Sequence, residues 1–160
     1  MPPPMLVNPS EVDCSRLAYT REQIYEVLPQ RYEFAQLDGI VRLDVESRLA
    51  IGFRDVRADE WWCRGHMPGK PIFPGVLMVE CAAQLAAFAA HFMQPDVSGF
   101  VGFGGIDKAK FRDSIEPPAR IVLACRGVDM RPRRIICETQ AYLKGTVVFE
   151  ATVTGLRLQW

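Results

Sequence analysis

Apolar and polar residues alternate along much of the chain, with the period of two that is typical of half-buried strands. The first two such segments are residues 37–45 and 48–56. The pattern returns later in three runs, residues 119–130, 134–144 and 146–158. Residues 99–111 are rich in glycine and aromatic residues, which favours strand structure that a ligand or another backbone approaches closely. We therefore predict strands in all of these segments.

Two other segments have features of helices. Thr20 is followed three residues later by Gln23, a capping-box pattern that predicts a short helix ending before Pro29. Residues 76–93 are almost continuously apolar and predict a long helix that ends before Pro95. The predicted order is two strands, a long helix and then further strands. It lacks the alternation of strands and helices that is typical of a parallel sheet. The order predicts an α+β fold in which an antiparallel sheet covers the long helix.

The long apolar segment just reaches the length of a membrane-spanning helix. Glu80, Gln84 and His91 lie within it, however, and a carboxylate inside a membrane is costly. No clear basic cluster flanks the segment. We expect a helix that is apolar all round because the protein's own sheet buries it, and we expect no membrane span.

Composition and charge narrow the class of protein. The 160 residues most simply form one domain, and 49% apolar with 24% charged residues is the balance of a soluble globular protein. Lys and Arg together number 19, as do Asp and Glu, so the formal net charge is zero. This balance argues against a nucleic-acid-binding protein and favours self-association. The proline-rich residues 1–19 are expected to form an extended, poorly ordered arm that precedes a domain at residues 20–160.

The five cysteines are odd in number, and no pair has CxxC spacing. We expect reduced, mostly buried thiols in a cytoplasmic protein. Cys63 and His66 have C-x-x-H spacing, but the only other histidine is His91. Zinc would need two more ligands, so no metal site is predicted. The first residues also lack the basic and apolar regions of a signal peptide.

A proline- and glycine-rich loop carries His66 and runs directly into the long helix. Pro71 and Pro74 limit the freedom of this loop, so its side chains are held rigidly. If the helix begins near Gly75, its unpaired N–H groups and its dipole form a site for a carbonyl oxygen that gains negative charge. His66 is suited to act as a general base. A lone histidine is also often a structural hydrogen-bonding residue, and this alternative stays open.

The helix carries one carboxyl group among apolar residues. Glu80 lies about 7–8 Å along the helix axis from Gly75, and Gln84 follows one turn later on the same face. Without a partner, a carboxyl in apolar surroundings favours its neutral form and can act as a general acid. A base, an acid and an oxyanion-type donor suit removal of a proton next to a carbonyl with loss of a hydroxyl. A structural Glu80 that meets a backbone N–H or an arginine is the alternative.

The sequence GHMPGKPIFPGVLMVECAAQ, at residues 65–84, resembles the signature of the FabZ-type 3-hydroxyacyl-acyl-carrier-protein dehydratases. The family pattern is roughly G-H-F-P-G-x-P-x-x-P-G-V-L-x-x-E-x-x-A-Q, and this chain departs from its fixed positions only at Met67. The segments LPQRYEF and GIDKAKFR resemble two further family motifs, and the similarity covers roughly residues 20 to 158. The resemblance implies a hotdog fold, in which a curved antiparallel sheet wraps the long helix.

The resemblance also implies an assembly and a mechanism. It implies a homodimer, with larger assemblies such as a trimer of dimers, in which His66 of one subunit faces Glu80 of the other. His66 would remove the α-proton of a 3-hydroxyacyl thioester, and Glu80 would protonate the departing hydroxyl. The N–H of Gly75 would hold the thioester carbonyl, with Val76 beside it among the substrate-binding residues, and Gln84 would help to orient the carboxyl. No metal or organic cofactor is implied, and an acyl carrier protein delivers the acyl group on its phosphopantetheine arm.

Further residues are candidates for contacts with the acyl chain and its carrier. Phe103 and Phe111 are expected to line the acyl tunnel, although core packing explains them almost as well. Carrier proteins are acidic, so a basic docking surface is expected. The two candidate clusters are Lys108, Lys110 and Arg112 along one strand, and Arg131, Arg133 and Arg134 in a turn. A cluster of charges is more often simply a solvated face, and this alternative stays open for both clusters.

Departures from the family pattern leave the identity of the substrate open. Gln30 replaces a family histidine and is interpreted as structural, while Pro118 and Ala119 replace a Gly-Asp turn. The leading hypothesis is a dehydratase that makes trans-2-enoyl thioesters. The alternatives are a hotdog thioesterase, which would not need His66, a non-catalytic acyl-binding protein, and an enzyme that also isomerises the enoyl product.

Overall fold

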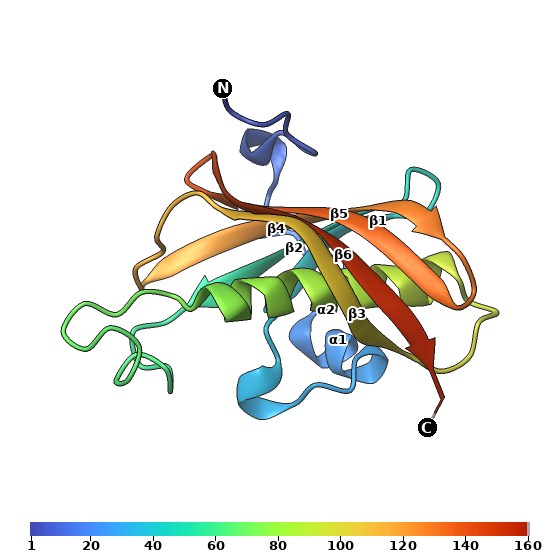
Figure 1. Ribbon diagram of the computed structural model, residues 1–160, viewed down its shortest axis with the longest axis horizontal. Coiled ribbons are helices and arrows are strands. Elements are labelled where there is room, and N and C mark those ends of the chain that lie inside the picture. Colours follow the sequence, from blue (N-terminus) through green and yellow to red (C-terminus); the bar gives the residue numbers. More distant parts are fainter. Residues whose placement is uncertain (160) are drawn as a thin grey trace.

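A six-stranded antiparallel sheet curls around one long helix in the computed structural model, which describes residues 1–159 (Figure 1). The sheet order is β1-β2-β4-β5-β6-β3, so β1 and β3 are its edges. The predicted domain limit at residue 160 lies outside the described residues. In chain order the elements are the 3₁₀ turn η1 (Pro9–Glu11), α1 (Arg21–Val27), the 3₁₀ turn η2 (Tyr32–Phe34), β1 (Gly39–Asp44), β2 (Leu49–Val56), α2 (Gly75–Met93), β3 (Phe100–Phe111), β4 (Ala119–Met130), β5 (Arg134–Leu143) and β6 (Thr146–Leu158).

Helix α2 forms the centre of the hydrophobic core. The sheet covers one side of it and α1 lies on the other, as Figure 1 shows. Leu85, Phe88 and Ala90 have no exposed surface, and alanines at several neighbouring positions let the strands approach closely. By length and composition α2 could cross a membrane, but its burial inside the sheet is that of a core helix.

The local sequence signals place most element boundaries correctly. The side chain of Thr20 accepts a hydrogen bond from the backbone of Gln23, and the side chain of Gln23 returns one to Thr20, so the predicted capping box is confirmed. Helix α2 begins directly after Pro74 and ends before Pro95, as predicted. Residues 99–111 form the single strand β3, and its pairing with β6 is irregular at two places.

The N-terminal arm lies on the outer face of the sheet, on the side opposite α2 (Figure 1). The buried side chain of Gln140 accepts a hydrogen bond from the backbone N–H of Leu6 at 2.8 Å and donates one to the carbonyl of Pro4 at 2.9 Å. Leu6 and Val7 pack on a small second apolar cluster that includes Tyr142. This part of the arm makes specific contacts with the sheet; the expected poor order of residues 1–19 stays a prediction.

Candidate active site

The loop between β2 and α2 fixes the ring of His66. Its backbone N–H donates to the carbonyl of Trp62 at 2.7 Å, and its Nδ1 lies 2.7 Å from the carbonyl oxygen of Ile72. A carbonyl oxygen only accepts, so Nδ1 carries a hydrogen, and in the neutral ring Nε2 is the nitrogen that keeps its lone pair. The next residue, Met67, has a left-handed backbone with φ 60°. The half-buried imidazole is therefore oriented as a proton acceptor at Nε2.

Glu80 lies in the second turn of α2 and is half buried. The expectation of a neutral carboxyl assumed that Glu80 has no partner. Its Oε1 instead accepts a hydrogen bond from Nε2 of Gln84 at 2.7 Å. The same nitrogen donates to the carbonyl of Phe34 at 2.6 Å, and Oε1 of Gln84 accepts from the backbone N–H of Gln36 at 2.9 Å. Both ends of the Gln84 amide are thus occupied, so only its N–H can face Glu80.

A small hollow of about 40 Å³ lies beside Glu80, between α2 and strands β3 and β6. Gln84 and the predicted tunnel residue Phe103 line it. Gln30, which we interpreted as structural, also lines it, and the buried Oε1 of Gln30 has no hydrogen-bond partner within the described residues. His66 is not among the lining residues, so one chain does not bring the base and the acid together around this hollow.

The start of α2 presents free donors. Pro74 caps the helix without a side-chain hydrogen bond, and its carbonyl accepts from the N–H groups of Leu77 and Met78. Within residues 1–159 the N–H groups of Gly75 and Val76 have no acceptor, as expected for the first turn of a helix. These are the donors that the predicted oxyanion-type site requires.

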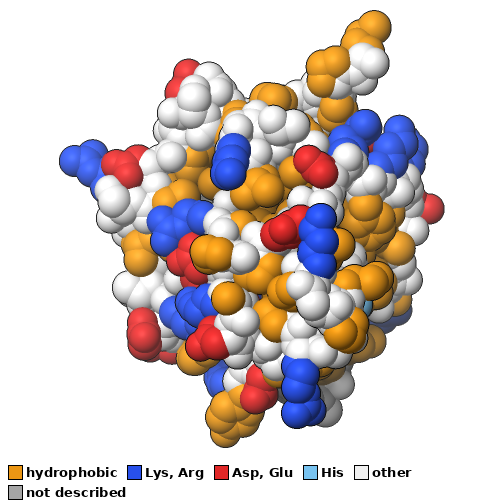
Figure 2. Space-filling model, turned by 90° about the vertical axis from the view of Figure 1, so that its left-hand side faces the viewer, with side chains coloured by type: hydrophobic (Ala, Val, Ile, Leu, Met, Phe, Trp, Pro, Cys, Tyr) orange, Lys and Arg blue, Asp and Glu red, His pale blue; other side chains and the backbone are white. Residues whose placement is uncertain are grey.

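Apolar side chains are exposed around this helix start. Val76 is 76% exposed and Phe111 is 56% exposed. Phe111 does not line the hollow beside Glu80; it lies against Phe149 and next to Gly75. Figure 2 looks onto the end of the molecule that carries the His66 loop and shows hydrophobic side chains between charged ones. The predicted substrate-binding residues thus fall into two groups, one beside Glu80 and one at the helix start.

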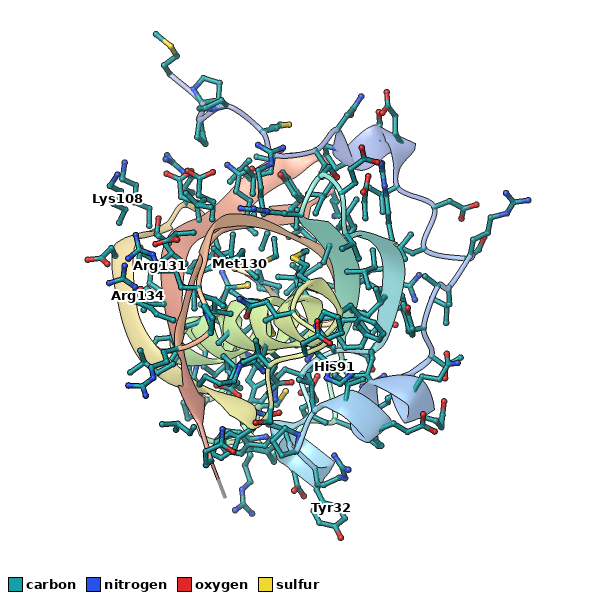
Figure 3. The ribbon with its side chains drawn as sticks, turned by 90° about the vertical axis from the view of Figure 1, so that its right-hand side faces the viewer. Tyr32, His91, Lys108, Met130, Arg131 and Arg134 are labelled. Atoms are coloured by element: carbon teal, nitrogen blue, oxygen red, sulfur yellow. The ribbon has the colours of Figure 1, made fainter. Side chains whose placement is uncertain are left out.

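The basic clusters are partly neutralised. Lys110 and Arg112 both contact Glu150, at 3.9 and 2.7 Å, and Lys108 borders a surface hollow that Glu150 also lines. Arg131 and Arg134 pair with Asp129, at 3.1 and 3.3 Å, while Arg133 has no ion pair with a described residue. Figure 3 shows Lys108, Arg131 and Arg134 on the outer side of the sheet, away from α2.

The cysteines carry no disulfide within the described chain, and three of the five are buried. Cys81 directly follows Glu80, but burial raises the pKa of its thiol to about 12, so it is not a nucleophile at neutral pH. The sulfur of Cys63 lies near the carbonyl of Arg57. Within residues 1–159 no three His, Cys, Asp or Glu side chains form a cluster that could hold a metal ion.

The wrapped helix and its sheet define a hotdog-fold protein, which confirms the predicted fold class. A solved structure with this arrangement is the dehydratase heterocomplex ApeI:P from Xenorhabdus doucetiae, with a TM-score of 0.71 and 11% identity over 85% of this chain and 91% of that one.

The family follows from sequence. The model of the FabA-like domain matches residues 28–152. A 3-hydroxyacyl-[acyl-carrier-protein] dehydratase FabZ of Desulfotalea psychrophila is 31% identical over 91% of this chain and 93% of its own length. The FabZ of Campylobacter jejuni is 36% identical over 84% of this chain and 94% of its own length. The chain belongs to the FabA-like family and, within it, to the FabZ-type dehydratases, as its motif predicted.

Proposed function

We propose that the protein is a 3-hydroxyacyl-[acyl-carrier-protein] dehydratase of fatty-acid biosynthesis, the activity named for the relatives it matches over most of its length. The observation that carries the site assignment is the fixed ring of His66, whose Nε2 is free to accept a proton. This ring stands on the loop that leads into the helix of Glu80. Base, acid and helix N-terminus are the three parts that dehydration needs.

The chemistry then runs as an elimination. Nε2 of His66 takes the proton from C2 of the 3-hydroxyacyl thioester, while the N–H of Gly75 stabilises the charge that develops on the thioester oxygen. The electron pair forms the C2–C3 double bond, and the C3 hydroxyl leaves as water with the proton that Glu80 carries. His66 is left protonated and Glu80 ionised, so one proton returns from base to acid before the next turnover.

The site is completed by a second copy of the chain in this proposal. His66 does not line the hollow beside Glu80, and β3, which carries the half-exposed Phe103, is an edge strand whose one strand neighbour in the described sheet is β6. A homodimer that joins two sheets at β3 would bring His66 of one protomer to Glu80 of the other. Larger assemblies of such dimers fit the same proposal, as does a cytoplasmic location, because the free thiols suit a reducing compartment.

The carrier is the proposed protein partner. Acyl carrier proteins are acidic, and the two basic clusters on the outer side of the sheet are the candidate landing surfaces. Arg133 is the residue of these clusters to change first, because it has no ion pair with a described residue. Loss of this charge should weaken binding of the acyl carrier protein and leave turnover of a short pantetheine thioester unchanged.

The assay that tests the function uses 3-hydroxyacyl carrier thioesters of several chain lengths and follows the absorbance of the enoyl product. Wild-type protein is expected to dehydrate them, and His66→Ala and Glu80→Gln are expected to lose most of the activity. Release of free thiol, measured in parallel, tests the thioesterase alternative. Full hydrolysis by His66→Ala without any dehydration would favour a thioesterase, and equal dehydration by wild type and Glu80→Gln would remove Glu80 from the mechanism.

A further inference from the structure

A network of buried hydrogen bonds continues inward from Gln84. The backbone N–H of Gln36 donates to Gln84, and the side-chain Oε1 of Gln36 accepts from Nε of Arg54 at 3.1 Å. Nε2 of Gln36 donates to the carbonyl of Glu33 at 2.7 Å. Gln36 is only 1% exposed and Arg54 only 4%. Buried polar groups are costly unless each has a hydrogen-bond partner, so this hydrogen-bond network is a specific part of the core.

The guanidinium of Arg54 anchors this hydrogen-bond network. One of its nitrogens contacts Glu60 directly, another lies 3.6 Å from Asp38, and the group sits over the ring of Phe73. A cation with a side chain 5% exposed is stable only with such partners. Arg54 is therefore held in one position, and it in turn fixes the side chain of Gln36.

A second branch runs from the same guanidinium toward the His66 loop. Glu60 accepts a hydrogen bond from the indole of Trp62 at 3.0 Å and one from the backbone N–H of Arg57 at 2.8 Å. Burial alone would raise the pKa of Glu60, but the hydrogen bonds from Arg54, Arg57 and Trp62 outweigh it and hold the pKa below its ordinary value. The carbonyl of Trp62 then accepts the backbone N–H of His66.

We propose that Gln36 and Arg54 are positioning residues for dehydration: they fix the backbone that locks the Gln84 amide, and so aim its N–H at the carboxyl of Glu80. Reversal of that amide would point an oxygen at the carboxyl group of Glu80 and remove the N–H donor that orients it. The proposal rests on the proposed function, because it assigns these residues a role in the reaction of Glu80. Arg54 also reaches the His66 loop through Glu60, whereas the side chain of Gln36 is connected to that loop only through Arg54.

The test is a double-mutant cycle between Gln36 and Glu80. Gln36→Leu keeps a similar volume and the backbone N–H but removes the three side-chain hydrogen bonds, to Glu33, Arg54 and Cys81. Its kcat is expected to fall on the order of tenfold with KM within about twofold, because orientation of the acid and not substrate binding is lost. In the Glu80→Gln background, measured in single turnover, the same change should have no further effect, since no acid remains to be aimed.

A matched control separates this role from stability. Gln140 is also a buried glutamine, 6% exposed, with three side-chain hydrogen bonds, but it lies on the outer face of the sheet. Gln140→Leu is expected to lower the melting temperature as Gln36→Leu does, yet to keep kcat. If Gln36→Leu does not fold, the same double-mutant cycle is measured with Gln36→Glu, which retains an acceptor for Arg54. Gln36→Glu is expected to keep more activity than Gln36→Leu.

The outcomes are distinct. Wild-type kcat in Gln36→Leu, or an equal fall in the wild-type and Glu80→Gln backgrounds, overturns the positioning role while the dehydratase assignment stands. Absence of dehydration by the wild-type protein overturns the proposed function itself. A fall in kcat that is confined to proteins with an intact Glu80 supports the inference.

Discussion

At the scale of single residues, the direction of one hydrogen bond decides what His66 can do. Its Nδ1 faces the carbonyl oxygen of Ile72, which can only accept, so the proton must be on Nδ1. The sequence indicated a base at this position but not which nitrogen would be free. That distinction depends on a carbonyl six residues away, which only the folded loop brings into contact.

Gly75 is predicted to be needed for the approach of substrate to the helix start. A methyl group there would stand 2.9 Å from the ring of Phe111, which is exposed and can move, so the folding cost of Gly75→Ala should be small. Because the Cα–Cβ bonds of a helix tilt toward its N-terminus, we expect the methyl group to narrow the approach to the unpaired N–H groups. We expect kcat/KM for dehydration to fall on the order of tenfold or more with little change in melting temperature.

Gly65→Ala is the control for this prediction, because a methyl group at Gly65 would meet no atom within 4 Å. It should keep wild-type kcat/KM. Equal activity of Gly75→Ala and Gly65→Ala would mean that the thioester does not approach the N-terminus of α2.

At the scale of elements, helix α2 ties the active site to the core. Leu85 has no exposed surface and follows Gln84 directly, so Leu85→Ala removes buried contacts at the centre of the sheet. We expect a loss of about 2–5 kcal/mol in the free energy of unfolding, measured by urea denaturation. His91→Ala, at an exposed position of the same helix, should change it by less than about 0.5 kcal/mol. If Leu85→Ala lowers the free energy of unfolding no more than His91→Ala does, α2 is not central to the hydrophobic core.

Elements with a strong local signal were predictable from sequence, and contacts between distant segments were not. The strands at residues 119–130 and 146–158 have the predicted limits, because alternation and flanking turn residues both mark them. Gln36 lies in an irregular segment between η2 and β1, so no periodicity identified it as buried. Its partner Arg54 was an ordinary polar position of a predicted strand, and only the packing of β2 beside α2 gives it a role.

At the scale of the whole molecule, the partly buried ion pair of Arg54 and Glu60 makes stability depend on pH. The pKa of Glu60 in the native state is below its ordinary value of 4.5, so the unfolded chain takes up a proton first as the pH falls. Stability from this group is present above about pH 4.5 and is lost as the pH falls through the lower, native-state pKa. Urea denaturation across this range should show less acid sensitivity in Glu60→Gln than in wild type. Glu138→Gln, a change at an exposed residue, should keep the wild-type profile.

The assembly decides whether the proposed site exists at all, and mixed dimers test it directly. His66→Ala and Glu80→Gln each remove one group from both sites of their own homodimer. In a mixed dimer with shared sites, one site loses both groups and the other keeps both. Co-expressed with different affinity tags and purified as the mixed species, this dimer should regain about half of the wild-type dehydration rate, since one of two sites is intact.

Dimers of two differently tagged Glu80→Gln chains are the control and should stay as slow as the parent variant. A mixed dimer no faster than its parents would show that His66 and Glu80 do not meet across two chains. Recovery would, in contrast, explain why His66 is absent from the hollow beside Glu80 in a single chain. It would also mean that each Arg54 supports the acid of one site and the base loop of the other, so that the core of each protomer serves both sites of the dimer.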